Sequence, residues 1–313
     1  MKLLVSSAPH ITGKDTTASL MRDLIIAMVP AMAASVFFFG VQALILTAVS
    51  VLACVAFEFL YQKMLKKPVT ISDLSAAVTG ILIAFNCPPT LPLWTVVIGA
   101  FFAIVIVKQL FGGLGYNFAN PAIVARIILG LGYTGLMTSW TFPTPISGDV
   151  VAKATPLAAY ANGAGTAPAF IDMFVGSVGG VLGETSALAL LIGFVYLVVR
   201  KVISPTIPVT YVATVAVMAV LLGVDPVVYV FSGGLLLGAI FMATDYVTSP
   251  YTEKGKIIFG IGLGLITVII RRYGAMAEGV SYAILLMNLV VPYINKATRQ
   301  KPLGAPKAVK EAK

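Results

Sequence analysis

The chain has 313 residues, of which 59% are hydrophobic and 11% are charged, and its mean hydropathy is +0.98. Soluble domains have about a quarter of their residues charged, so this composition excludes a soluble, disordered or fibrous protein. The formal net charge is +9. Its basic residues are spread over many short segments and form no aromatic-laced basic face. We therefore expect a membrane protein that binds membrane lipids and no nucleic acid.

The apolar residues gather in runs of about 15 to 22 residues, the length that a helix needs to cross the hydrocarbon core. The first run is expected to remain as a span, because the residues before it show no cleavage site for a signal peptide. The expected fold is an all-α polytopic membrane protein with about ten spans. We place them at residues 22–39, 42–60, 74–91, 92–108, 121–139, 177–199, 208–223, 226–244, 256–270 and 277–294.

The distribution of Lys and Arg predicts the orientation of these spans. An even number of spans puts both termini on one side. If that side is the cytoplasm, the outer segments contain only Lys153, Arg271 and Arg272, and the inner ones hold most of the other basic residues. Because basic loops stay cytoplasmic, we expect a multi-pass protein of the cell inner membrane. Both termini and the basic tail, residues 295–313, should be cytoplasmic, and the loop at 139–172 should lie outside.

Two segments suggest helices that break within the membrane. Residues 86–92 combine Asn86 with three prolines, and residues 223–226 join the seventh and eighth spans through Gly223, Asp225 and Pro226. Prolines remove backbone donors, and such breaks are tolerated where protein lines a cavity. The pattern favours a five-plus-five inverted repeat with a site between the halves. A simple turn between spans three and four is the alternative interpretation of the first segment.

The long outer loop contains a threonine that a modifying enzyme could reach. Its sequence from Asp149 to Ala158 is DVVAKATPLA. The residue before a proline is held extended, so the hydroxyl of Thr155 can point away from the chain. Lys153, two positions earlier, could complement the charge of a phosphate attached to Thr155. A loop of this length in a compact protein is typical of a functional segment.

This loop resembles the flavinylation motif of a known family, whose members include the RnfD subunit of the Rnf electron-transport complex and the NqrB subunit of the sodium-translocating NADH:quinone reductase. The matching residues are Asp149, four further positions, and then Ala154 and Thr155, followed by Pro and Leu. In that family a flavin transferase esterifies FMN to the threonine through its phosphate. The resemblance implies Thr155 as the attachment site, with Asp149 and Ala154 as recognition positions. The sequence departs from the usual motif at Ala152 and Lys153.

The resemblance covers nearly the whole chain. Further matching segments are residues 88–94, 116–122, 183–187 and 232–250. It implies a single integral membrane domain, residues 1–313, in which the 139–172 loop bears FMN. The chain would relay electrons within an ion-translocating ferredoxin:NAD oxidoreductase and couple them to sodium or proton transport, without a complete active site or metal site of its own. The short N-terminal stretch favours the Rnf protein over its quinone-reductase counterpart.

The same resemblance implies cofactors and partners. A noncovalent flavin such as riboflavin is expected between the helices, in addition to covalent FMN. The partners would be the flavin transferase and other Rnf subunits, including a second FMN-bearing subunit and iron–sulfur membrane subunits. Cys54 and Cys87 have no CxxC spacing, so no iron–sulfur site is expected within this chain. The competing hypothesis is an inverted-repeat solute transporter with no redox role.

Several charged residues near membrane depth are further candidates for function, because burying a charge in a membrane is costly. Glu184 and Asp225 could line an ion path or a flavin pocket. Arg126 could bind a flavin or lipid phosphate, or extend its side chain to the interface. Glu58 and Asp245 have a simpler explanation, which is pairing with Lys63 and Lys254.

Overall fold

A computed structural model of the chain describes residues 16–139, 157, 169–274 and 278–300, and within these ranges the regular structure is helical, with no strand. The first half contains α1 (Thr17–Phe39), α2 (Val41–Met64), the short η1 (Ile71–Asp73), α3 (Ser75–Phe85), α4 (Leu93–Phe101), η2 (Phe102–Gln109), α5 (Pro121–Gly132) and α6 (Thr134–Met137). The second half contains α8 (Phe170–Val175), α9 (Ala187–Val199), α10 (Thr206–Leu221), α11 (Pro226–Phe231), α12 (Leu235–Leu237), η3 (Gly238–Met242), α13 (Glu253–Tyr273) and α14 (Val280–Thr298). Both η2 and η3 are π-helices.

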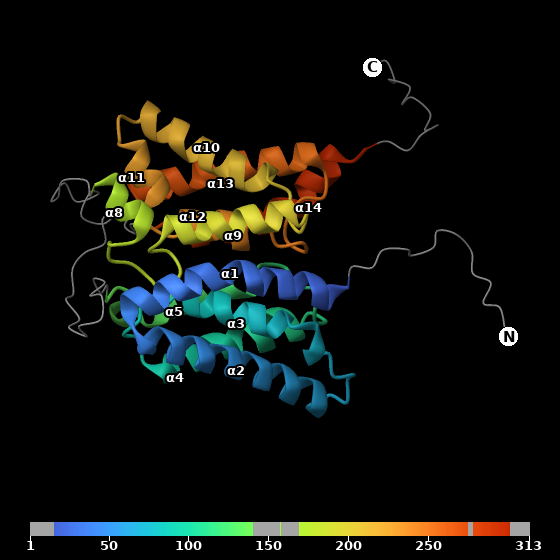
Figure 1. The fold of residues 1–313 in the computed structure, drawn as a ribbon. Coiled ribbons are helices and arrows are strands. Elements are labelled where there is room, and N and C mark those ends of the chain that lie inside the picture. Colours follow the sequence, from blue (N-terminus) through green and yellow to red (C-terminus); the bar gives the residue numbers. More distant parts are fainter. Residues whose placement is uncertain (1–15, 140–156, 158–168, 275–277, 301–313) are drawn as a thin grey trace, which may run out of the picture.

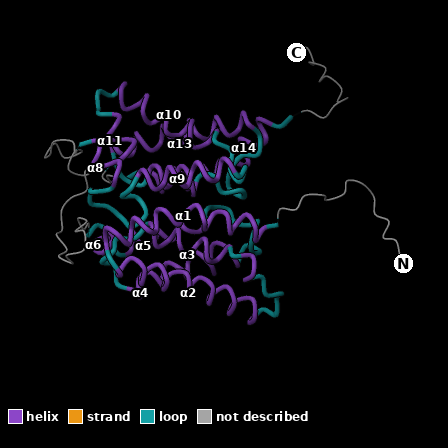
Figure 2. Tube along the Cα trace, viewed as in Figure 1, coloured by secondary structure: helices purple, strands orange, loops and turns teal. Residues whose placement is uncertain are grey.

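The two halves of the chain form two bundles that lie side by side (Figure 1). The tube in Figure 2 shows long helices running roughly along one direction, with most connections at the two ends. Helix α1 packs against α9 across the boundary, and α10 packs against α13 within the second half. The start of α1 and the end of α14 lie at the same end of the molecule (Figure 1). We call this the terminal end, and the opposite end, near α8 and α11, the far end.

Local sequence explains where several helices begin. The Thr16 side chain accepts a hydrogen bond from the Ser19 backbone N–H, and the Ser19 hydroxyl accepts one from the Thr16 backbone N–H, which forms a capping box for α1. Asn120 caps α5 and precedes Pro121, which has no N–H to satisfy at the first helical position. Gly40, with φ of 70°, ends α1 and allows the turn into α2.

The membrane fold predicted from hydropathy is confirmed. By length and apolar composition, α1, α2 and α14 can each cross a membrane, and shorter apolar helices occupy residues 75–85, 93–109, 121–132, 187–199 and 206–221. Many large apolar side chains on these helices face outward, among them Phe37, Leu52 and Val199. An exposed apolar surface of this extent is expected where lipid replaces water.

Two predicted spans differ from the structure in instructive ways. The span at 177–199 is helical only from Ala187, so Glu184 lies in an irregular segment before α9. The span at 226–244 is interrupted at Ser232 to Gly234, between α11 and α12, whereas residues 223–225 form a turn between α10 and α11. The break after α3, at Asn86, lies where it was predicted. The inverted relation between the halves stays a prediction.

Candidate functional site

Thr155, Asp149 and Ala154 lie outside the described residues, but Leu157 shows where the chain passes two positions later. Its side chain is buried, with 3% exposed. A methyl group added to Gly233 would lie 3.2 Å from Leu157 Cδ2 and 3.2 Å from Arg271 Nη2. Leu157 therefore packs beside Gly233, at the helix break between α11 and α12.

Arg126 of α5 joins the two halves of the chain. Its Nη2 forms an ion pair with Glu278, which precedes α14, and its Nη1 donates a hydrogen bond to Asn86 Oδ1 at 2.5 Å. Asn86 Nδ2 in turn donates to the carbonyl oxygen of Leu82 at 2.6 Å. The guanidinium predicted to bind a phosphate thus has partners within the chain, and its binding of a flavin stays a prediction.

Glu184 and Arg271 complete this buried polar cluster. Val181 N–H donates to Glu184 Oε1 at 3.3 Å, while Arg271 donates from Nη1 to the Tyr229 carbonyl at 2.5 Å and from Nη2 to the Ser232 carbonyl at 3.3 Å. Arg271 therefore satisfies carbonyl groups at the end of α11, where no intrahelical donor remains. Among the residues that the structure describes, Glu184 Oε2 and Arg271 Nε have no hydrogen-bond partner.

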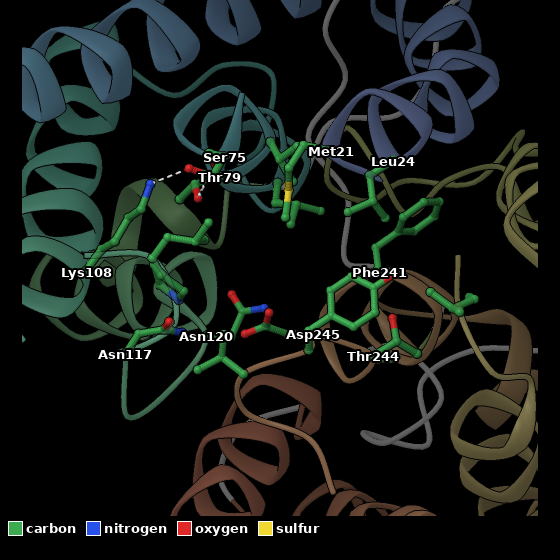
Figure 3. Close-up of a pocket in the computed structure, with 17 residues that line it drawn as sticks. Met21, Leu24, Ser75, Thr79, Lys108, Asn117, Asn120, Phe241, Thr244 and Asp245 are labelled. Carbon is green, nitrogen blue, oxygen red and sulfur yellow. Dashed lines mark hydrogen bonds between the residues drawn. The ribbon is translucent and has the colours of Figure 1, made fainter. Parts of the chain in front are cut away.

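A pocket lies at the terminal end, between the two halves (Figure 3). One part of its wall is polar, with Ser75 and Thr79 of α3, Lys108 of η2, and Asn117 and Asn120 before α5. Another part is apolar, with Met21 and Leu24 of α1, Leu82 of α3 and Phe241 of η3. Figure 3 shows Lys108 and Ser75 on the opposite side of the pocket from Phe241. This combination suits a flat aromatic ring with a polar edge.

Hydrogen bonds hold two of the polar residues that line the pocket, and one of these bonds joins the two halves. Asn120 Oδ1 accepts from the backbone N–H of Ala122 at 3.0 Å, and Asn120 Nδ2 donates to the Met242 carbonyl at 3.2 Å. Asp245, near Asn120 in Figure 3, accepts a hydrogen bond from Thr248 Oγ1 at 3.0 Å. Asp245 lies in the connection after η3, outside the predicted spans, and burial raises the pKa of its carboxyl above the ordinary value.

The other acidic candidates have structural partners. Glu58 Oε2 lies 2.6 Å from Lys108 Nζ, so the pairing with Lys63 proposed from the sequence is replaced by a buried one with a different lysine. Within the described part of the chain, Asp245 accepts a hydrogen bond from Thr248 and forms no ion pair with Lys254. Asp225 caps α11 by accepting from Val227 N–H at 2.8 Å. Cys54 and Cys87 are free, buried thiols.

Three important residues were not singled out from the sequence. Lys108 and Arg271 were treated as cations at the ends of spans, yet their side chains are 3% and 4% exposed. Glu278 was not considered, although it pairs with Arg126. The sequence could have indicated the role of Lys108, because this lysine lies in an apolar run. A lysine that cannot reach water needs a buried acidic partner.

Comparison with known proteins identifies relatives along the whole chain. The model of the NQR2, RnfD, RnfE family matches residues 4–304. The D subunit of the Na(+)-translocating ferredoxin:NAD(+) oxidoreductase complex of Acetobacterium woodii is 52% identical over 100% of this chain and 99% of its own length. The D subunit of the proton-translocating ferredoxin:NAD(+) oxidoreductase complex of Clostridium ljungdahlii is 39% identical, with 96% of each chain covered. The D subunit of the ion-translocating oxidoreductase complex of Methanosarcina acetivorans is 38% identical over the same shares.

Proposed function

This chain belongs to the NQR2, RnfD, RnfE family, and from that premise we propose that it acts as the RnfD subunit of an Rnf-type ferredoxin:NAD oxidoreductase. It is a membrane subunit of an ion-translocating oxidoreductase complex, and other subunits of the complex are its partners. The observation that carries the finer assignment is full-length similarity to the D subunits of such complexes, at up to 52% identity among those compared. Together with the motif at Thr155, it favours a redox subunit over a solute transporter.

We propose that Thr155 carries FMN through a phosphoester bond made by a flavin transferase. The sequence Thr155-Pro156 favours an extended backbone before the proline, which would let the threonine hydroxyl oxygen become the bridging oxygen of the ester. Leu157, two positions after Thr155 in the sequence, is buried beside Gly233. When bound, FMN supplies the electron transfer, and the protein supplies its position, its electrostatic surroundings and its access to partners.

The pocket at the terminal end is the proposed site of the noncovalent flavin. Ser75, Thr79, Lys108, Asn117 and Asn120 offer hydrogen-bond donors and acceptors to the polar edge of such a ring. Leu24, Leu82 and Phe241 offer apolar contacts to its faces. A site at this end would lie on the opposite side of the membrane from Thr155. The chain would then hold one flavin near each surface of the membrane.

The proposed orientation has the terminal end in the cytoplasm and the far end outside, as the distribution of basic residues indicates. Cysteines introduced at Lys66, at the end of α2, and at Asn162, in the predicted outer loop, test it. A membrane-impermeant reagent added outside should label the Asn162 position alone. Labelling of that position only from the cytoplasmic side would contradict both the orientation and an outer FMN.

In-gel flavin fluorescence after denaturing electrophoresis tests the redox assignment, because only covalent flavin survives that treatment. The wild-type chain should fluoresce, the Thr155→Ala chain should not, and the matched Thr144→Ala change in the same loop should leave the signal intact. A wild-type chain without fluorescence, from cells that contain the flavin transferase, would instead favour a transporter with no redox role.

A further inference from the structure

The buried Lys108 is fixed in the wall of the terminal-end pocket by two hydrogen-bonding partners. Its ammonium forms an ion pair with Glu58 Oε2 at 2.6 Å and donates to Ser75 Oγ at 2.6 Å. Ser75 is itself held in place, because its hydroxyl donates a hydrogen bond to Asp73 Oδ1 at 2.5 Å. Glu58 is held as well, because Gln62 Nε2 donates to Glu58 Oε1 at 3.4 Å. The ammonium of Lys108 is therefore held in a defined place.

The ammonium of Lys108 makes two hydrogen bonds within the described part of the chain. An ammonium group has three N–H donors, and within the described part of the chain two of them are accounted for by Glu58 and Ser75. Lys108 itself lines the pocket, whereas Glu58 does not. Figure 3 shows its side chain reaching toward Ser75 at the edge of the cavity. A ligand in the pocket can thus accept a charge-assisted hydrogen bond from Lys108, which is stronger than a neutral one.

The ion pair also sets the local charge that such a ligand experiences. Lys108 and Glu58 together are neutral, but the positive member is nearer to the cavity because it alone lines it. In a low-dielectric interior the nearer charge has the larger effect. This wall of the pocket should therefore stabilise the more negative of two charge states of a bound ligand.

We propose that Lys108 contacts the ring of the noncovalent flavin and stabilises its reduced form, and that Glu58 is a positioning residue that holds Lys108 and moderates its charge. This inference rests on the proposed flavin in the pocket. Reduction by two electrons from a reduced flavin or iron–sulfur centre of the complex, with one proton from water, leaves one extra negative charge on the ring. Glu58 Oε2 lies 2.6 Å from Lys108 Nζ and so keeps the ammonium in place.

Potentiometric titration of the purified complex, with Thr155→Ala present to remove the covalent flavin of this chain, tests the inference. A Thr79→Trp change should fill the pocket and exclude its flavin. The redox transition that disappears in this variant is then the transition of the pocket flavin. Glu58→Gln should then raise the reduction potential of that flavin and Lys108→Gln should lower it. Each change should alter the ratio of reduced to oxidised flavin at least tenfold, which is about 30 mV for two electrons.

The double change Glu58→Gln with Lys108→Gln should give a potential between those of the two single variants, because it removes both opposing charges. The matched control is Glu253→Gln, which removes an exposed ion pair with Lys256 (2.6 Å) at a residue that does not line the pocket, and should not shift the potential. Shifts of the same sign in both single variants, or no shift in Glu58→Gln with the flavin retained, would overturn the inference. If no flavin transition disappears with Thr79→Trp, the pocket holds no flavin, and both the pocket assignment and this inference fail.

Discussion

Arg126 of α5 and Glu278, which precedes α14, form an ion pair that connects the first half of the chain to the second. Their side chains are 9% and 20% exposed. Asn86, at the break after α3, accepts a hydrogen bond from the same guanidinium. One arginine thus holds together a broken helix, a helix of the same half and a connection of the other half.

Removing one partner of this pair should destabilise the protein, because the other charge would stay largely shielded from water without compensation. We expect Arg126→Gln to cost about 3–5 kcal/mol of unfolding free energy, measured as a lower unfolding temperature of the purified complex. The double change Arg126→Met with Glu278→Leu should recover most of that loss. An unchanged unfolding temperature in Arg126→Gln would show that the ion pair does not join the halves.

The contact between α1 and α9 depends on a glycine. A Cβ at Gly193 would collide with the carbonyl oxygen of Ala27 and lie 3.0 Å from Phe241 Cζ. Gly193→Ala should therefore separate the helices and lower stability by about 1–3 kcal/mol. Gly130→Ala in α5 is the matched control, because nothing lies within 4 Å of its added Cβ. If both variants unfold at the same temperature as the wild type, close packing at Gly193 is refuted.

The raised pKa of Asp245 predicts how stability responds to pH. A carboxyl whose pKa is higher in the folded state than in the unfolded state costs no stability below the unfolded value of about 3.9. The cost grows as pH rises from the unfolded to the folded pKa, and it is complete above the folded pKa. Asp245→Asn removes this cost, and its carbonyl oxygen can still accept from Thr248. The variant should unfold at a higher temperature than the wild type at about pH 8, with little difference at about pH 4. A difference that is independent of pH would point to another cause.

Hydropathy was sufficient to predict most of the fold but little of its polar core. The spans at 208–223 and 256–270 correspond to α10 and α13, because length and apolar character determine which segments can cross a membrane. The break at Ser232 to Gly234 was not predicted, since glycine in a membrane helix is equally consistent with close packing. Arg271 was assigned to an outer segment because it follows the span predicted at 256–270. Its burial could not be predicted, since its carbonyl partners, Tyr229 and Ser232, are distant in the sequence.

In the candidate site, too, some residues could be predicted from the sequence and others could not. Thr155, Asp149 and Ala154 were identified by a local motif, which needs no knowledge of the fold. The pocket could not be predicted, because α1, α3, η2 and η3 bring its walls together from separate parts of the chain. The pairing of Glu58 with Lys108 depends on the same packing, since the two residues are 50 positions apart.

The central claim is that Thr155 carries FMN, and tandem mass spectrometry of a digest of the native complex tests it most directly. The peptide that contains Thr155 should carry the mass of FMN less one water, with fragment ions that place the addition on Thr155. The peptide that contains Thr144 should carry none and serves as the internal control. An unmodified Thr155 peptide as the main species, in cells that contain the flavin transferase, would contradict the account.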